Sequence, residues 1–271
     1  MSGAPPIATV ACALADLSSA EWFERLGFTL SSPSSYQFLG SLPSGRPSLD
    51  GPTDSLGLRG RYATFADASY LEFVAPAGDG RPSLTYGDFV AAHGEGWMKV
   101  SLGVDSLTPH FLRLCAAGRL NDGAPWTFWR RHFADTRGVP ASHTTSLISL
   151  SAERELLVAL TEQLDRVADP ALSAHANGAV GIRGVTVLAT GPAALAGLFD
   201  GAAAVEVLDR PDGWPIAPPI HRPCVAAPTV AVADLDALAR RLREGAVDHT
   251  TVAGGLLAWR PDGSLPIRFA E

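Results

Sequence analysis

Residues 9–28 read TVACALADLSSAEWFERLGF. The stretch opens with a short apolar segment typical of a strand, continues through a polar cap, and ends in one amphipathic helix and a glycine. Ser18 or Asp16 can cap the helix by accepting a backbone N–H, and Gly27 can end it in a left-handed conformation. The apolar positions at helical spacing are Trp22, Phe23 and Leu26. The stretch therefore predicts a strand followed directly by a helix.

The same order of strand, cap, helix and glycine recurs at residues 99–118, 185–201 and 229–245. Segments that read as strands follow each helix: 61–65 and 70–74, then 126–133 and 144–150, then 205–208, then 256–259 and 266–269. Each unit is therefore one strand, one helix and two or three further strands. Four such βαβββ units predict an α+β fold of mixed sheets with helices on one face.

The four units pair into two tandem domains. We expect an N-terminal domain at 7–150, which carries the active cup, and a compressed C-terminal domain at 181–271. Between them, residues 152–164 show a helix pattern, so 151–180 is predicted as a helical bridge and linker. The segment 32–57 is rich in Pro, Ser and Gly and reads as a long loop, either a lid over a cavity or a disordered insertion.

The composition excludes several classes of protein. Of 271 residues, 46% are hydrophobic and 18% charged, which is typical of a folded chain and not of a disordered one. A net charge of −7 argues against nucleic-acid and anionic-membrane partners, because both need a basic face. No apolar run approaches the roughly 20 residues that span a bilayer, and no basic leader precedes residue 7. We therefore expect a cytoplasmic protein.

The cysteines and glycines indicate no cofactor motif. Cys12, Cys115 and Cys224 are odd in number and far apart, which predicts free thiols and neither disulfides nor a metal site. No glycine-rich phosphate-binding turn follows a strand, so a nucleotide cofactor is not expected.

The motifs resemble those of the vicinal oxygen chelate superfamily, which includes glyoxalase I, bleomycin-resistance proteins and extradiol dioxygenases. The resemblance rests on the sequences ALADL at 13–17, ERLGF at 24–28 and YLEFVAP at 70–76. The sequence HANG at 175–178, before the strand at 185–189, resembles the glyoxalase-like subfamily with tandem domains. The resemblance implies that two βαβββ units close into a curved sheet around a cup.

The resemblance also implies a divalent metal in the cup, with ligands from the first and last strands of each unit. The first-strand positions hold Thr9, Lys99, Arg183 or Gly184, and Ala227; the last-strand positions hold Glu72, Ser149 and Arg268. Only Glu72 is a usual ligand, whereas a tightly held divalent ion needs at least three. We therefore expect no metal cofactor. If a metal were bound, Glu72 and His143 would be its ligands.

Side-chain alternation along the strands brings Lys99 and Glu72 towards the same centre. The ammonium of Lys99 could take the electrostatic role of the metal as a donor to a developing oxyanion, with Glu72 as general base. Lys99 could also be a nucleophile, or the pair could be a purely structural ion pair. On the same cup-facing side, the residues expected to position a substrate are Thr9, Tyr70 and Ser101.

Residues 126–133 read WTFWRRHF, a second cluster that carries chemistry. Strand alternation places Trp126, Phe128, Arg130 and His132 on one face. Aromatic rings with arginine suit a planar or anionic ligand, and histidine exchanges protons near neutral pH. This face is either a substrate-binding wall with His132 as a catalytic acid or base, or a solvated face with arginine stacked on tryptophan.

The sequence therefore predicts a glyoxalase-like enzyme that works without a metal. The expected chemistry is acid–base catalysis of the lyase, isomerase or cyclase type on a small organic molecule such as a natural product. One alternative is a non-catalytic protein that binds or sequesters a drug. Another is a metal-dependent dioxygenase or glyoxalase. The expected partners are a small-molecule substrate and a second copy of the chain in a homodimer.

Overall fold

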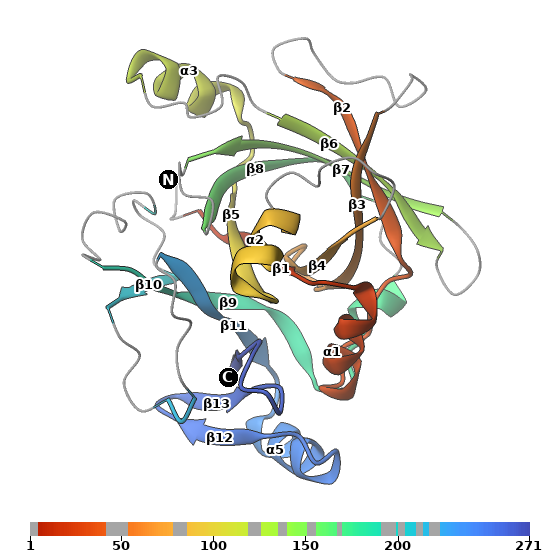
Figure 1. The fold of residues 1–271 in the computed structure, drawn as a ribbon, viewed down its shortest axis with the longest axis vertical. Helices are drawn as coiled ribbons and strands as arrows, with labels where there is room; N and C mark the ends of the chain where they lie inside the picture. The colour runs from red at the N-terminus through yellow and green to blue at the C-terminus, as the bar shows by residue number, and fades with distance from the viewer. Residues whose placement is uncertain are drawn as a thin grey trace.

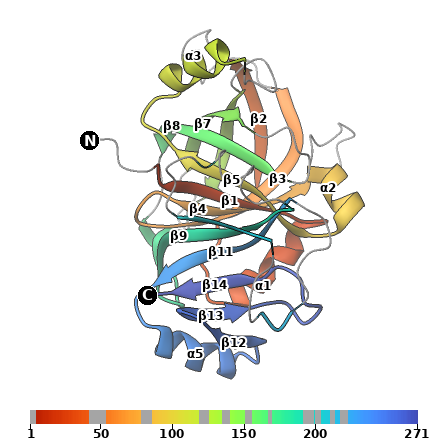
Figure 2. The ribbon, with the colours of Figure 1, turned by 90° about the vertical axis from the view of Figure 1, so that its left-hand side faces the viewer.

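The strands of the protein form two bodies that pack against each other (Figure 1). The computed structural model describes residues 5–41, 54–77, 86–118, 126–134, 140–150, 156–166, 170–190, 199, 204–209, 214–216 and 223–271. Turned by 90°, the molecule shows a barrel in its upper part, a second sheet below it, and helix α5 at the far end (Figure 2). Within the described residues, no helix is long and apolar enough to cross a membrane.

The first body is a closed barrel of eight strands. These are β1 (Ile7–Ala13), β2 (Ser34–Ser41), β3 (Asp54–Thr64), β4 (Tyr70–Pro76), β5 (Gly96–Gly103), β6 (Trp126–Ala134), β7 (Pro140–Ser149) and β8 (Leu157–Arg166). Their order around the barrel is β1-β4-β3-β2-β6-β7-β8-β5. The first strand of each unit is parallel to its last, β1 to β4 and β5 to β8, while β1 and β5 are antiparallel. Two βαβββ units thus close into one barrel, as predicted.

Short helices connect the barrel strands. They are the 3-10 turn η1 (Leu17–Ala20) and the α-helices α1 (Glu21–Arg25), α2 (Tyr86–His93) and α3 (Thr108–Ala116). Of the two predicted caps, Asp16 is the one used, since its carboxylate accepts the N–H of Ser18 at 2.8 Å. Gly27 ends α1 with φ +92°, a conformation that favours glycine. The sequence did not predict α2.

The second body is an open six-stranded sheet. Its elements are β9 (Ala179–Leu188), β10 (Val205–Leu208), β11 (Cys224–Val232), α5 (Leu235–Glu244), β12 (His249–Val252), β13 (Gly255–Ala258) and β14 (Ile267–Ala270), with strand order β10-β9-β11-β14-β13-β12. The unit from β11 to β14 is a complete βαβββ unit. Its helix is capped by Asp234, whose carboxylate accepts the backbone N–H of Ala237 over 2.8 Å. The helix predicted at 192–199 lies outside the described residues, apart from Phe199.

The two bodies share one hydrophobic core. Phe28 of the barrel stacks on Phe269 of β14, with ring centroids 6.0 Å apart. The indole N–H of Trp97, in β5, donates to the carbonyl of Pro266 over 2.8 Å, so a buried polar group is satisfied across the junction. Stacked rings and a buried hydrogen bond fix the second sheet against strands β1 and β5 of the barrel.

Two predictions about the fold were wrong. The segment 152–164, expected to be a helix in the bridge 151–180, instead contributes to β8, which runs parallel to β5 and closes the barrel. Its apolar run from Leu156 to Leu160 is buried except at Leu157, and a short continuous apolar run has no periodicity that separates a helix from a buried strand. The segment 32–57 is not all loop, since β2 and β3 occupy both of its ends. The rest of it, with the predicted lid, lies outside the described residues.

The linker before β9 is anchored to the barrel through His175. This buried ring accepts the backbone N–H of Thr29 at Nδ1, 3.0 Å away. Its Nε2 lies 2.9 Å from the carbonyl oxygen of Thr64, so Nε2 carries the proton of a neutral imidazole. Burial lowers the pKa of His175, because the charged form loses its hydration. Protonation at Nδ1 would also break the hydrogen bond from Thr29.

These contacts predict a pH-dependent part of the stability. The pKa of His175 is lower in the folded state than in the unfolded chain. Its contribution to the free energy of unfolding is therefore complete above the ordinary pKa of 6.5 and is lost as the pH falls from 6.5 through the lower pKa of the folded state. We expect the difference in free energy of unfolding between the wild type and His175→Gln, measured by urea denaturation, to shrink from about pH 7.5 to about pH 5.5, one unit either side of that value. His110→Gln is the control, and a difference for His175→Gln that stays constant with pH would contradict the assignment.

Candidate active site

The candidate site lies where β1 is flanked by β4 and β5. In the strand register, Ala11 of β1 is paired with Glu72 on one side and with Lys99 on the other. The side chain of Ala11 is small, so those of Glu72 and Lys99 can meet over it. The structure therefore brings together the two residues that the sequence placed at one centre.

Lys99 and Glu72 form a buried ion pair. The Nζ of Lys99 lies 2.8 Å from Oε2 of Glu72, and the hydroxyl of Tyr36 donates to Oε1 over 2.6 Å. Glu72 is fully buried and Lys99 is only 5% exposed. Removing two charges from water costs several kcal/mol per ion, and only close pairing with further hydrogen bonds offsets this. Here the lysine neutralises the charge of the carboxylate and the phenol provides the additional hydrogen bond.

Tyr36 is the site residue that the sequence did not reveal. It comes from β2, inside the segment that reads as a loop, and reaches the carboxylate across β3. A Cβ atom at Gly60 of β3 would lie 2.5 Å from the Tyr36 hydroxyl oxygen, so the tyrosine occupies space that a side chain would fill. The only sequence signal is the alternation in 34–38, and the surrounding serines and prolines obscure it.

Two hydroxyls lie on the same wall without partners. Thr9 of β1 and Ser101 of β5 are paired in register, and both are fully buried. Neither side-chain oxygen has a hydrogen-bond partner among the described residues. Each such group costs about 1–3 kcal/mol relative to a satisfied one, so native structures keep few of them. Thr9 and Ser101 thus offer hydrogen bonds that a bound molecule could complete.

Tyr70 extends this wall with an aromatic surface. It is paired with Thr9 in register and is buried. Its ring packs edge-on against Tyr62 at 5.8 Å, and Tyr62 in turn lies 6.4 Å from the ring of Tyr36. Three tyrosines therefore line the barrel beside the ion pair. Thr9, Tyr70 and Ser101, the predicted positioning residues, all lie on this wall.

The predicted aromatic wall occupies the opposite side of the barrel. Strand β6 is four strands from β1 in either direction of the strand order. The side chains of its candidate residues, Trp126, Phe128, Arg130 and His132, lie outside the described part of the structure. The backbone of Arg130 is paired with that of Tyr36 in β2 and of His143 in β7. The side chain of His143 also lies outside the described part.

The described residues do not fit the metal site that the resemblance implies. Strand β8 is paired with β5 as β4 is with β1, so Ala159, opposite Ser101, is the counterpart of Glu72. The predicted counterpart, Ser149, was wrong because it lies on β7. The four implied positions thus hold Thr9, Glu72, Lys99 and Ala159, a set with one carboxylate. The ammonium of Lys99 lies against this carboxylate, at the oxygen that a metal ion would otherwise bind. Among the described residues, no group of three or more His, Cys, Asp or Glu could hold a metal.

The fold and the family model agree on the class of protein. The model of the glyoxalase-like domain matches residues 9–202. The chain therefore belongs to the glyoxalase-like domain family, within the vicinal oxygen chelate superfamily. No curated protein matches the chain.

Two solved structures show the same fold. A Mn(II)-bound glyoxalase from Novosphingobium aromaticivorans has a TM-score of 0.55 at 14% identity, covering 99% of this chain and 82% of that one. A mutant 4-hydroxymandelate synthase from Streptomyces coelicolor has a TM-score of 0.52 at 15% identity, covering 99% and 92%. At this identity the likeness shows the fold alone and leaves the chemistry to the residues of the site.

The buried pair predicts a strongly non-additive mutant cycle. Lys99→Met leaves the carboxylate of Glu72 buried without its counter-charge, and such removal costs about 3–5 kcal/mol. The double variant Lys99→Met, Glu72→Gln removes both charges and keeps an acceptor for Tyr36. We therefore expect its free energy of unfolding, measured in guanidinium, to exceed that of Lys99→Met alone. If the loss of free energy of unfolding in the double variant equals the sum of the losses in the two single variants, the two charges do not depend on each other.

Proposed function

We propose that the protein is an enzyme that moves protons on a small carbonyl compound inside the barrel, without a bound metal. The observation that carries this proposal is the ammonium of Lys99, 2.8 Å from Glu72. It stands where the resemblance implies a divalent ion. A cation in that place can stabilise a negative oxygen by hydrogen bonding, while the adjacent carboxylate accepts a proton.

Lys99 is the proposed oxyanion donor. An ammonium has three N–H groups, and the described residues accept one of them, at Glu72 Oε2. The others are available to the carbonyl oxygen of a substrate. Buried donors act strongly on developing charge, because little water competes for it. The hydroxyls of Thr9 and Ser101 would supply additional donors to the same molecule.

Glu72 is the proposed general base. Its carboxylate takes the proton from the carbon next to the carbonyl, the C–H electron pair moves into the new C=C bond, and the carbonyl electrons move to the oxygen held by Lys99. The hydrogen bond of Tyr36 keeps Glu72 Oε1 oriented while Oε2 faces the lysine. Return of the proton to a second carbon gives an isomerase, and loss of a leaving group gives a lyase. The same enolate attacking within the molecule gives a cyclase.

The opposite wall completes the proposal. Trp126, Phe128 and Arg130 on β6 would hold the planar or anionic part of the substrate, and His132 would deliver or remove a second proton. The partner is thus a small organic molecule, and a second copy of the chain remains an expected partner in a homodimer.

Proton abstraction can be measured before the substrate is known. The panel of test compounds contains 2-oxo acids, hydroxyketones and thioesters dissolved in D2O. We expect the protein to catalyse deuterium incorporation at the carbon next to the carbonyl in at least one of them. Proton NMR measures this exchange as the loss of the C–H signal. Glu72→Gln removes the base and should lower the rate by about 10²–10⁴-fold, the usual contribution of a general base. Lys99→Met should lower it as well, since the enolate loses its donor.

Glu24→Gln is the matched control for this experiment. Glu24 pairs with Arg61 over 2.6 Å at the surface, so its loss breaks an ion pair without touching the barrel. Exchange that survives Glu72→Gln and Lys99→Met at the level of Glu24→Gln would overturn the mechanism.

A binding protein is the second candidate, favoured by the ring cluster of Tyr36, Tyr62 and Tyr70. Aromatic rings bury large planar surfaces and are common in ligand pockets. Such a protein would bind or sequester its ligand at one molecule per chain without deuterium exchange or turnover. Stoichiometric protection against a drug, unaffected by Glu72→Gln, would select this function over the enzyme.

The proposed independence from metal has its own test. Because Lys99 already neutralises Glu72, we expect purified protein to bind Mn(II), Fe(II) or Zn(II) weakly, and deuterium exchange to survive treatment with a chelator. Elemental analysis of protein purified without chelator measures the metal content directly. Near one metal ion per chain, together with exchange that depends on re-adding it, would instead support a metal-dependent glyoxalase or dioxygenase.

A further inference from the structure

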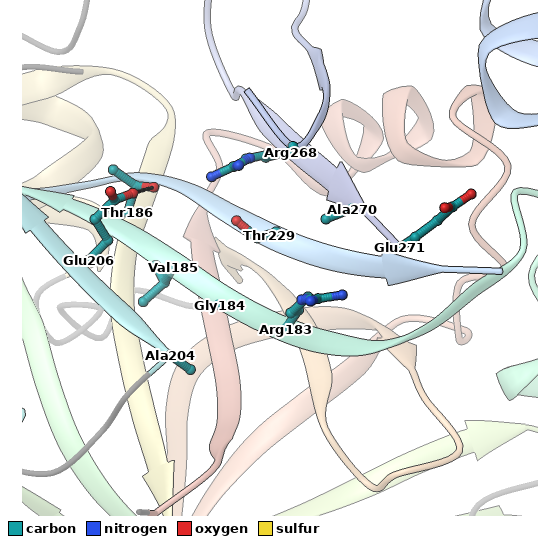
Figure 3. Close-up of a pocket in the computed structure, with 11 residues that line it drawn as sticks. Arg183, Gly184, Val185, Thr186, Ala204, Glu206, Thr229, Arg268, Ala270 and Glu271 are labelled. Carbon is teal, nitrogen blue, oxygen red and sulfur yellow. Dashed lines mark hydrogen bonds between the residues drawn. The ribbon is translucent and has the colours of Figure 1, made fainter. Parts of the chain in front are cut away.

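The second sheet carries an open pocket of about 370 Å³ that the proposed enzyme does not use. Strands β9, β11 and β14 supply most of its lining, and the edge strand β10 and the turn before β13 complete it (Figure 3). Its volume lies at the small end of the range for small-molecule pockets.

The pocket is the counterpart of the barrel site. Thr229 of β11 is paired with Arg268 on one side and Gly184 on the other, as Ala11 is paired with Glu72 and Lys99 in the barrel. The counterpart of Glu72 is thus the positively charged Arg268, and the counterpart of Lys99 is Gly184, which has no side chain. The internal counter-charge that neutralises the barrel site is missing at this position in the second sheet.

Two arginines supply the positive side of the pocket. Arg268 is held from β14 by a hydrogen bond from Nη2 to the carbonyl of Ala253, and its Nε has no partner among the described residues. Arg183 is exposed on β9. Figure 3 shows Thr229 on the strand between these two arginines. A guanidinium and a hydroxyl together match the oxygens of a carboxylate.

Glu206, on the edge strand β10, supplies a negative group to the same pocket (Figure 3). Its carboxylate accepts a hydrogen bond from the hydroxyl of Thr186 over 3.5 Å, the limit of such a bond. Glu271, which also lines the pocket, already accepts the N–H of Leu235 at the start of α5. Within the described part of the chain, neither glutamate forms an ion pair with an arginine, so these opposite charges of the pocket are not paired with each other there.

We propose that this pocket binds a small zwitterion with a carboxylate and an ammonium group, as in an α-amino acid. The carboxylate binds Arg183, Arg268 and Thr229, and the ammonium binds Glu206. The separated charges favour this ligand over others. A metal ion or a diamine would meet two arginines, and a phosphate or dicarboxylate would face the carboxylate of Glu206. A zwitterion brings a group of opposite charge to the arginines and to Glu206 at once.

The standard amino acids, each at millimolar concentration, are the probes. Binding to the full chain is measured by titration calorimetry and ligand-observed NMR. We expect at least one amino acid to bind, and its N-acetyl and carboxamide derivatives to bind about ten-fold more weakly or not at all, since each lacks one charge. Failure of every amino acid to bind, or equal binding of the N-acetyl derivative, would overturn the proposal.

Variants locate the binding within the molecule. Arg183→Gln and Glu206→Gln each remove one pocket charge from an exposed side chain, and each should weaken binding about ten-fold. Arg240→Gln and Glu244→Gln on α5 are exposed, line no part of the pocket and serve as matched controls with unchanged affinity. Circular dichroism confirms that all four variants fold. An affinity that is the same in the pocket variants and the controls would place the amino acid elsewhere and reject this site.

Discussion

Burial of the Lys99–Glu72 pair constrains the barrel more than any other interaction described. Each charge can leave water only because the other lies 2.8 Å away, and this distance requires β4 and β5 to hold their registers on either side of β1. A slip of one residue in either strand would turn one charge out of the barrel and leave the other buried alone. The pair therefore links the chemistry of the site to the closure of the barrel.

The proposed enzyme uses an ammonium where the resemblance implies a divalent ion, and the two groups differ in what they can do. A metal acts as a Lewis acid and needs several ligands with a free coordination position. An ammonium offers directed N–H groups, needs one neighbouring acid, and leaves that acid able to accept a proton. In the proposed enzyme, Lys99 and Glu72 would thus supply a donor and a base side by side where a metal would supply one polarising centre. Tyr36 reinforces this division, because it holds the carboxylate oxygen that the lysine does not.

Local signals explain how much of this could be predicted from the sequence. The cap Asp16 and the stop Gly27 define one unit, and repetition of that unit gives the order of elements along the chain, the fold class and the meeting of Lys99 with Glu72. Strand β8 was missed because an apolar run has no period of its own, and its pairing with β5 depends on residues far away in the chain. Tyr36 was missed for a related reason: its role depends on the space at Gly60, which is a property of the closed barrel.

The two halves of the chain solve one electrostatic problem in opposite ways. In the barrel, the residues on either side of Ala11 are Glu72 and Lys99, so their opposite charges neutralise each other and both side chains are buried. In the second sheet, the residues on either side of Thr229 are Arg268 and Gly184, so the charge has no internal partner and the face stays open. A duplicated framework that loses one charge of a pair must either expose the other to solvent or recruit a ligand. The presence of Glu206 in the same pocket as Arg268 favours a ligand that carries both signs.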